Sequence, residues 1–155
     1  MLLGLVMFVW LRPWLLGKGE ALVHRAEAGI EGWTTDGCLI VSTRFAETAQ
    51  VHRVCQPLGM REQLTFYPEP ISGVTASPAK AWRKGFVFAK DKGGDEFSQL
   101  YWFDEATRST TLLTDGKRSQ DGGTTLTRDG GLMAYSSTAR NGADRDIWIR
   151  NTRTG

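Results

Sequence analysis

A unit of about 48 residues recurs along this chain of 155 residues. The pairs Asp36-Gly37 and Asp129-Gly130 lie 93 positions apart (129 − 36), which is two periods, and the segments around them, 32–44 and 125–137, align with each other. A period of about 40 to 50 residues built from short strands and turns is typical of the blades of a β-propeller. The repeat therefore predicts an all-β chain.

Shorter strings repeat at nearly the same spacing. Gln63-Leu64-Thr65 returns as Leu112-Leu113-Thr114, and Gln50–Val54 returns as Gln99–Phe103 and then as Asp146–Arg150. A propeller typically has about four to eight blades, and this chain has about three units. We expect an incomplete β-propeller of about three blades of short antiparallel strands over residues 29–155, truncated before closure.

Apolar or alternating runs between turn residues predict the strands of the three units. The expected strands are Cys38–Ser42, Gln50–Val54, Met60–Phe66, Gly85–Lys90, Ser98–Asp104, Thr110–Thr114, Leu132–Ser136 and Asp146–Arg150. Tyr67–Pro70 is expected to cross between units, because prolines cannot donate ladder hydrogen bonds. Asn141-Gly142 is expected to supply the positive-φ residues of a tight hairpin.

An incomplete ring has an energetic consequence. A blade buries its faces against its neighbours, so a partial ring exposes an apolar face and open sheet edges. Each large apolar side chain left unburied forgoes about 1.5 to 3 kcal/mol, against a typical domain stability of about 5 to 15 kcal/mol. We therefore expect residues 1–155 alone to be unstable, aggregated or self-associated, and a sharp cooperative melt from a dilute monomer would contradict this.

Residues 1–28 form a separate segment of different composition. Residues 1–11 are apolar, Arg12-Pro13 interrupts them, and Trp14-Leu15-Leu16 follow. A membrane span needs about 20 predominantly apolar residues, and a secretory signal needs a basic start and a small-residue cleavage site. We expect a short apolar helix and a cytoplasmic chain without a membrane partner. A membrane anchor through residues 1–17 and a mis-assigned translation start are the alternatives.

Composition excludes one class of partner. Lys and Arg number 19 against 17 Asp and Glu, and no basic run is longer than a pair, so the chain has no electrostatic footprint for nucleic acid. Cys38 and Cys55 are too few for a disulfide framework and do not form a C-x-x-C pair. We expect them to be buried, reduced cysteines of a cytosolic protein.

Five strings carry a family resemblance: Ser42–Phe45, Gln50–Val54, Pro57–Phe66, Asp91–Phe97 and Ala134–Ile147. Together they resemble the amino-terminal propeller of prolyl oligopeptidase family serine peptidases, from about Gly29 to Gly155. The Leu-Thr and Asp-Gly pairs give a weaker likeness to the propeller of the Tol system.

The first resemblance implies a propeller that stands over an α/β-hydrolase domain and limits which peptides reach the active site. A serine nucleophile in a G-x-S-x-G elbow would follow downstream. No such motif occurs in the sequence, so no catalytic residue is carried over, and no cofactor or metal is expected.

Two main functions follow from these resemblances. The first is a non-catalytic propeller fragment of a serine peptidase that gates or positions peptide substrate, with the missing hydrolase domain as its partner. The alternative is a Tol-like propeller that binds a protein partner without enzymatic activity. A truncated gene product without function is a third hypothesis.

Possible metal and phosphate ligands are interpreted as structural. His52 and Cys55 are an odd number of residues apart, which places them on opposite faces of a strand, and His24 is the only other histidine. The remaining candidates lack the spacing of a calcium or phosphate loop and are expected to be solvated turn residues. They are Asp91, Asp95, Glu96, Asp144, Asp146 and the segment Asp115–Ser119.

Aromatic and basic residues complete the candidates. Trp33, Trp102 and Trp148 are expected to pack between blades rather than form a ligand cage. Arg44 and Arg140 follow matching strands and are expected in loops at one end of the blades, where they could touch peptide substrate. Solvated loop arginines are the favoured interpretation.

Overall fold

The computed structural model describes residues 28–44 and 47–155, and within these ranges every regular element is a β-strand. Residues 1–27 lie outside the described residues. They include His24, Trp10 and Trp14, the expected apolar helix and the segment 1–17 considered as a membrane anchor. Within the described part, no helix is long and apolar enough to cross a membrane.

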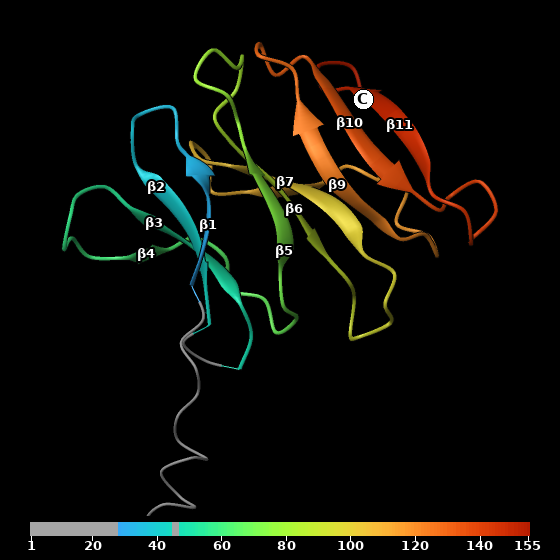
Figure 1. The fold of residues 1–155 in the computed structure, drawn as a ribbon, viewed down its shortest axis with the longest axis horizontal. Coiled ribbons are helices and arrows are strands. Elements are labelled where there is room, and N and C mark those ends of the chain that lie inside the picture. The colour runs from blue at the N-terminus through green and yellow to red at the C-terminus, as the bar shows by residue number, and fades with distance from the viewer. Residues whose placement is uncertain (1–27, 45–46) are drawn as a thin grey trace, which may run out of the picture.

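The strands form three antiparallel sheets that follow one another along the chain (Figure 1). The first sheet contains β1 (Ala28–Trp33), β2 (Leu39–Thr43), β3 (Gln50–Val54) and β4 (Glu62–Gln63); the second contains β5 (Ser72–Ala76), β6 (Gly85–Lys90), β7 (Gln99–Asp104) and β8 (Thr110–Leu112); the third contains β9 (Asp121–Leu126), β10 (Leu132–Ser137) and β11 (Asp146–Asn151).

The first strands of the three sheets lie next to one another. β5 contacts both β1 and β9, while the later strands of each sheet extend away from this row. Sheets that pack face to face, with their first strands together, have the arrangement of propeller blades. The predicted all-β, blade-like architecture is therefore confirmed.

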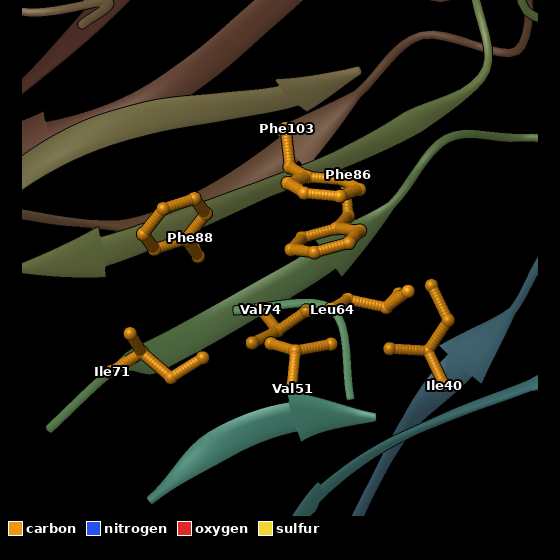
Figure 2. Packing of buried hydrophobic residues seen from close by; sticks show 8 residues of the cluster. All are labelled: Ile40, Val51, Leu64, Ile71, Val74, Phe86, Phe88 and Phe103. Carbon is orange, nitrogen blue, oxygen red and sulfur yellow. The ribbon is translucent and has the colours of Figure 1, made fainter. Parts of the chain in front are cut away.

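Two apolar cores hold the sheets together. Figure 2 shows the first core, in which Ile40 and Val51 of the first sheet face Phe86, Phe88 and Phe103 of the second. Successive side chains of a strand point to opposite faces. The alternate residues of β6 and β7 therefore reach the second core, which contains Val87, Ala89, Leu100, Trp102, Leu113 and Met133.

The repeated Leu-Thr pairs have the same role in two sheets. Thr65 Oγ1 accepts a hydrogen bond from an N–H of β3 at 2.9 Å, and Thr114 Oγ1 accepts one from β7 at 3.1 Å. Leu64 and Leu113 each donate their N–H to a carbonyl of the same two strands at 2.8 Å and are buried. The sequence repeat thus corresponds to a repeated way of fastening the outer segment of a sheet to its neighbour.

The Asp-Gly pairs also mark equivalent turns. In both turns a threonine lies two residues before the glycine's aspartate partner: Thr34 before Asp36, and Thr127 before Asp129. The threonine hydroxyl accepts a hydrogen bond from a backbone N–H and donates one to the aspartate carboxylate. In the second sheet, Ser77 accepts the N–H of Gly85 in the same manner, at 3.1 Å. A longer loop, 78–84, separates those two residues, so the middle unit shows no Asp-Gly pair.

The first strand of each sheet was not predicted. β1, β5 and β9 have the sequences AGIEGW, SGVTA and DGGTTL, which contain neither an apolar run nor a regular alternation. Small residues suit the contact between β1 and β5, since a Cβ on Gly32 would lie 3.3 Å from Ala76 Cβ. β4 is also shorter than the expected Met60–Phe66.

The expectation for Asn141-Gly142 is wrong in one respect. Gly142 has φ of 78°, but Asn141 does not have a positive φ. Instead, Asn141 Oδ1 accepts the N–H groups of Ala143 and Asp144 at 3.1 and 2.9 Å. The loop between β10 and β11 is too long for a two-residue hairpin, so the asparagine side chain shapes it by hydrogen bonding.

The expectation of reduced cysteines is also wrong. Cys38 and Cys55 form a disulfide, with Sγ atoms 2.11 Å apart and Cα atoms 4.1 Å apart. Leu39 pairs with Val54 across β2 and β3, so the next residues outward face each other. The number of cysteines does not reveal this pairing, because it depends on the strand register.

Candidate functional site

The chain reversals within the sheets gather at two ends. One of them, here called the turn end, contains the segments 33–39, 54–62, 76–86, 103–110, 126–132 and 151–155. Its part formed by the second and third sheets is seen at the top of Figure 1, where the green loop 78–84 stands beside the orange turn of the third sheet. Contacts between these segments join all three sheets at this end.

Large apolar side chains at the turn end are exposed to solvent. Leu58 and Met60 are fully or almost fully exposed (107% and 88%), Trp33 is 66% exposed and Trp82 is 46% exposed. Leu58 also has a positive φ of 59°, which is uncommon for a residue other than glycine. Protein interfaces are enriched in tryptophan, methionine and arginine relative to the remaining surface.

The loop 78–84 connects the second sheet to the third. Trp82 donates its backbone N–H to the Asp129 carbonyl at 3.0 Å, and its indole Nε1–H to Thr152 Oγ1 at 3.0 Å. Arg83 places its guanidinium carbon 3.9 Å from the centroid of the buried Trp102 ring. Burial lowers the pKa of Arg83, and stacking on an aromatic face stabilises the cation.

A hollow of about 390 Å³ lies at the turn end between the first and second sheets. Arg53, Arg83, Lys84, Asp104 and Glu105 line it. Burial raises the pKa of Glu105, and the charge of Asp36 raises it further, in spite of the opposing effect of nearby cations. The hollow therefore holds both signs of charge, with the carboxyl of Glu105 in its less hydrated part.

An ion-pair group closes one side of this region. The Glu62 carboxylate accepts a hydrogen bond from Arg108 of the second sheet and one from Arg53 Nη2 of the first sheet, the latter at 2.7 Å. These two guanidinium groups, Arg108 before Arg53, lower the pKa of Glu62. The Glu62 carboxylate thus links the first and second sheets at the turn end. Because these ion pairs are partly exposed, their contribution to stability is modest.

The residues considered as metal ligands have structural partners. His52 is buried, and its Nδ1 lies 2.8 Å from Thr43 Oγ1 and 3.1 Å from the Gln50 carbonyl oxygen. Burial lowers the pKa of this imidazole. Cys38 and Cys55 use their sulfur atoms in the disulfide. Within residues 28–44 and 47–155, no group of three His, Cys, Asp or Glu side chains could hold a metal ion.

The acidic loop candidates shape turns. Asp95 Oδ1 accepts the N–H of Phe97 at 3.1 Å, and Asp115 Oδ1 accepts that of Lys117 at 3.0 Å. Glu96 has a positive φ of 63° in the same loop as Asp91. These contacts occur within single loops, and they do not bring the carboxylates together around a common point.

Arg44 and Arg140 lie at the opposite end of the sheets from the turn end. Arg140 Nε donates to Asp146 Oδ2 at 2.5 Å, and Arg140 also pairs with Asp144 at 3.5 Å. Arg44 follows β2 and is exposed. The two arginines are therefore separate from the exposed apolar residues described above.

The expectation for the tryptophans is correct in part. Trp102 is buried between the second and third sheets, as predicted. Trp33 is 66% exposed and Trp148 is 41% exposed, so neither is enclosed between blades. Trp82 and Arg83 were missed as site residues, and their only sequence signal is the extra length of the middle unit between Ser77 and Gly85.

Comparison with known proteins supports the fold. No protein-family model and no curated protein matches the chain. Among solved structures, the crystal structure of TolB from Acinetobacter baumannii is similar, with a TM-score of 0.61 and 18% sequence identity over 84% of this chain. The chain spans 31% of the length of that structure. This likeness shows a TolB-like propeller fold, whereas the comparisons give no support to the prolyl oligopeptidase resemblance.

Proposed function

We propose that this chain is part of a propeller module that binds a protein partner through the turn end, without catalysis of its own. The observation that supports this proposal is the exposure of Trp33, Leu58, Met60 and Trp82 at one end of the sheets. Arginines and carboxylates surround them and would form the polar rim of an interface. The structural likeness to TolB is in keeping with a propeller module.

The energetics favour a few anchoring residues. Burial of a tryptophan removes about 150 to 250 Å² from water, and tryptophan and arginine are frequent among the residues that dominate binding energy. Trp33 belongs to neither apolar core and lies at the end of β1, so its exposed ring is available for such a contact.

The test is an interaction experiment with the full chain and matched variants. Proteins retained by the wild-type chain are identified, and the affinity of each is then measured for Trp33→Ala and for the double variant Leu58→Ser, Met60→Ser. We expect a loss of about 30-fold or more for Trp33→Ala, as for an interface hot spot. Arg44→Ser at the opposite end is the control and should bind like the wild type. Equal affinity of all variants would contradict the proposal.

The peptidase hypothesis rests on the sequence strings given above. Its test is to sequence the source DNA through and beyond the codon for Gly155. An in-frame continuation that contains G-x-S-x-G would support a gating domain of a peptidase. An immediate stop codon would leave a binding fragment or a broken gene, to which the enzymatic label applies by ancestry only.

The compartment is a separate proposal. Disulfides persist in oxidising compartments and are rare in the cytosol. The Cys38–Cys55 bond therefore favours an oxidising compartment over the cytoplasmic localisation expected from the sequence, and supports the Tol-like alternative over a cytosolic peptidase.

A further inference from the structure

The turn end carries its positive charge over the second and third sheets. The loop 78–84, the turn 126–132 and the segment 151–155 contain five cations against one carboxylate, Asp129, a net charge of +4 (5 − 1). The whole chain has a net charge of only +2, so positive charge is concentrated in this region. Its five cations, here called the basic patch, are Lys80, Arg83, Lys84, Arg128 and Arg153.

Hydrogen bonds hold the three segments of the basic patch side by side (Figure 1). Trp82 of the loop donates its backbone N–H to the Asp129 carbonyl and its indole N–H to Thr152 Oγ1, both at 3.0 Å. Two guanidinium groups lie against its ring, with the central carbon of Arg83 5.0 Å and that of Arg153 5.8 Å from the centroid. Trp82 therefore brings cations from two sheets to one place.

Most of these cations have no carboxylate of their own. Four of the five form no ion pair within residues 28–44 and 47–155. The exception is Arg153, whose Nη2 lies 3.4 Å from Asp129 Oδ2. Lys80, Lys84 and Arg128 are exposed. A group of exposed cations without counter-charges attracts an anionic partner and speeds its association.

The carboxylates around the basic patch do not cancel its charge. The neighbouring turn 103–110 contains Asp104 and Glu105 with one arginine, so the net charge including this turn is still +3 (6 − 3). Asp104 Oδ1 already accepts two backbone N–H groups of its own turn, at 3.0 and 2.9 Å. In the first sheet, the turn-end segments 33–39 and 54–62 have a net charge of −1 (1 − 2) and present exposed apolar side chains instead.

Arg83 is oriented for a direct contact with an anion. Its guanidinium carbon lies 3.9 Å from the centroid of the buried Trp102 ring, and together with Lys84 it lines the hollow between the first and second sheets. Its nitrogen atoms remain accessible to solvent. A planar guanidinium that stacks on a ring keeps its N–H edge free for a carboxylate, which it binds through two parallel hydrogen bonds.

We propose that the turn end binds an acidic segment of its protein partner, with the basic patch against the carboxylates and the first sheet against neighbouring apolar residues. This inference rests on the function proposed above and adds the chemistry of the partner. Carboxylates fit better than the phosphates of a nucleic acid, because the chain as a whole carries 19 cations against 17 carboxylates and has no basic run longer than a pair.

The experiment titrates the full chain with an acetylated hexaglutamate peptide and follows the indole N–H resonance of Trp82, assigned with Trp82→Phe. We expect a saturable shift in the wild type. The triple variant Lys80→Gln, Lys84→Gln, Arg128→Gln should bind about tenfold more weakly, since three attractive charges are removed. These side chains are exposed and form no ion pair, so the variant should be as resistant to denaturant as the wild type.

A matched control removes the same charge at the opposite end of the sheets. The triple variant Arg44→Gln, Lys92→Gln, Lys117→Gln should bind hexaglutamate like the wild type. Acetylated hexaglutamine should give no shift, and added salt should weaken the binding of hexaglutamate. An unmoved Trp82 resonance, or equal losses in the two triple variants, would overturn the proposal. Tighter binding of a short single-stranded oligonucleotide than of hexaglutamate would also overturn it and assign the basic patch to nucleic acid.

This inference and the proposed function fail separately, because the peptide titration needs no natural partner. Hexaglutamate binding together with unchanged partner affinity of Trp33→Ala would contradict only the apolar contact proposed for the first sheet. A loss of partner affinity in Trp33→Ala without hexaglutamate binding would contradict only the acidic chemistry of the partner.

Discussion

Glu105 shows how one residue at the turn end reflects two opposing forces. Cations nearby favour its charged form, but burial favours the neutral carboxylic acid and determines the direction of the pKa shift. Because its pKa is raised in the folded chain, the ionised side chain reduces stability at neutral pH. This cost disappears when acid protonates the residue in both the folded and the unfolded states.

Glu105→Gln should therefore stabilise the chain at pH 7, and the gain should vanish as the pH falls below the ordinary pKa of a glutamate. Between that value and the raised pKa, the folded chain binds more protons than the unfolded chain, so wild-type stability falls as the pH rises. Urea unfolding of both proteins from pH 4 to pH 8 measures this. A variant that is less stable at pH 7 would show that the contacts with nearby cations outweigh burial.

The residue scale also shows what sequence can and cannot predict. Leu64-Thr65 and Leu113-Thr114 are recognisable because the same hydrogen bonds require the same residue types twice. Ile71 and Asp121 also take equivalent places, because their N–H groups bond to the Ala49 and Ser98 carbonyls of successive sheets. The sequence does not reveal this equivalence, because one side chain is apolar and the other is a carboxylate. Only the shared backbone hydrogen bond reveals it.

At the scale of elements, the β2–β3 hairpin is closed covalently. The disulfide joins residues 17 positions apart and lies just beyond the paired ends of the two strands. Both strands were predicted from the sequence. The disulfide was not, because it depends on the register in which the two strands pair, and the number of cysteines carries no information on register. The first strands β1, β5 and β9 were missed because their glycines and short polar residues form neither an apolar run nor a regular alternation.

The double variant Cys38→Ser, Cys55→Ser should lose about 3 kcal/mol of unfolding free energy, the value expected for a closed loop of about 15 residues. Denaturant unfolding with and without a reductant measures the loss. Reductant should lower the wild type to the level of the variant and leave the variant unchanged. If reductant has no effect on the wild type, the bond does not stabilise the fold.

At the scale of the whole molecule, the outer face of the third sheet is apolar and exposed. Ile147 and Ile149 are 75% and 72% exposed, and they share this face with Leu132, which is 43% exposed. Strand alternation places Met133 on the opposite face, in the second core. In a stack of blades such a face is buried against the next blade.

The double variant Ile147→Ser, Ile149→Ser should weaken self-association of the chain, because two large apolar side chains are removed from the exposed face. Sedimentation velocity over a range of concentrations measures the change. Phe66→Ser, which removes a 74% exposed ring from the first sheet, is the matched control. Association that is unaffected by the serines would show that another surface is responsible.

The contact of Ala81 with Gly130 bears on how repeated sheets assemble in the correct order. A Cβ on Gly130 would lie 2.9 Å from Ala81 Cβ, so the loop 78–84 fits only against a turn that has no side chain there. Chains made of similar units are prone to misassembly, in which a unit docks on the wrong neighbour. Among the described units, only the middle one carries this loop, and its Trp82 also donates the indole N–H to Thr152 Oγ1, a contact specific to the third unit. We therefore expect the insertion that interrupts the periodicity of the sequence to favour docking of the middle unit on the third one over docking on a wrong neighbour.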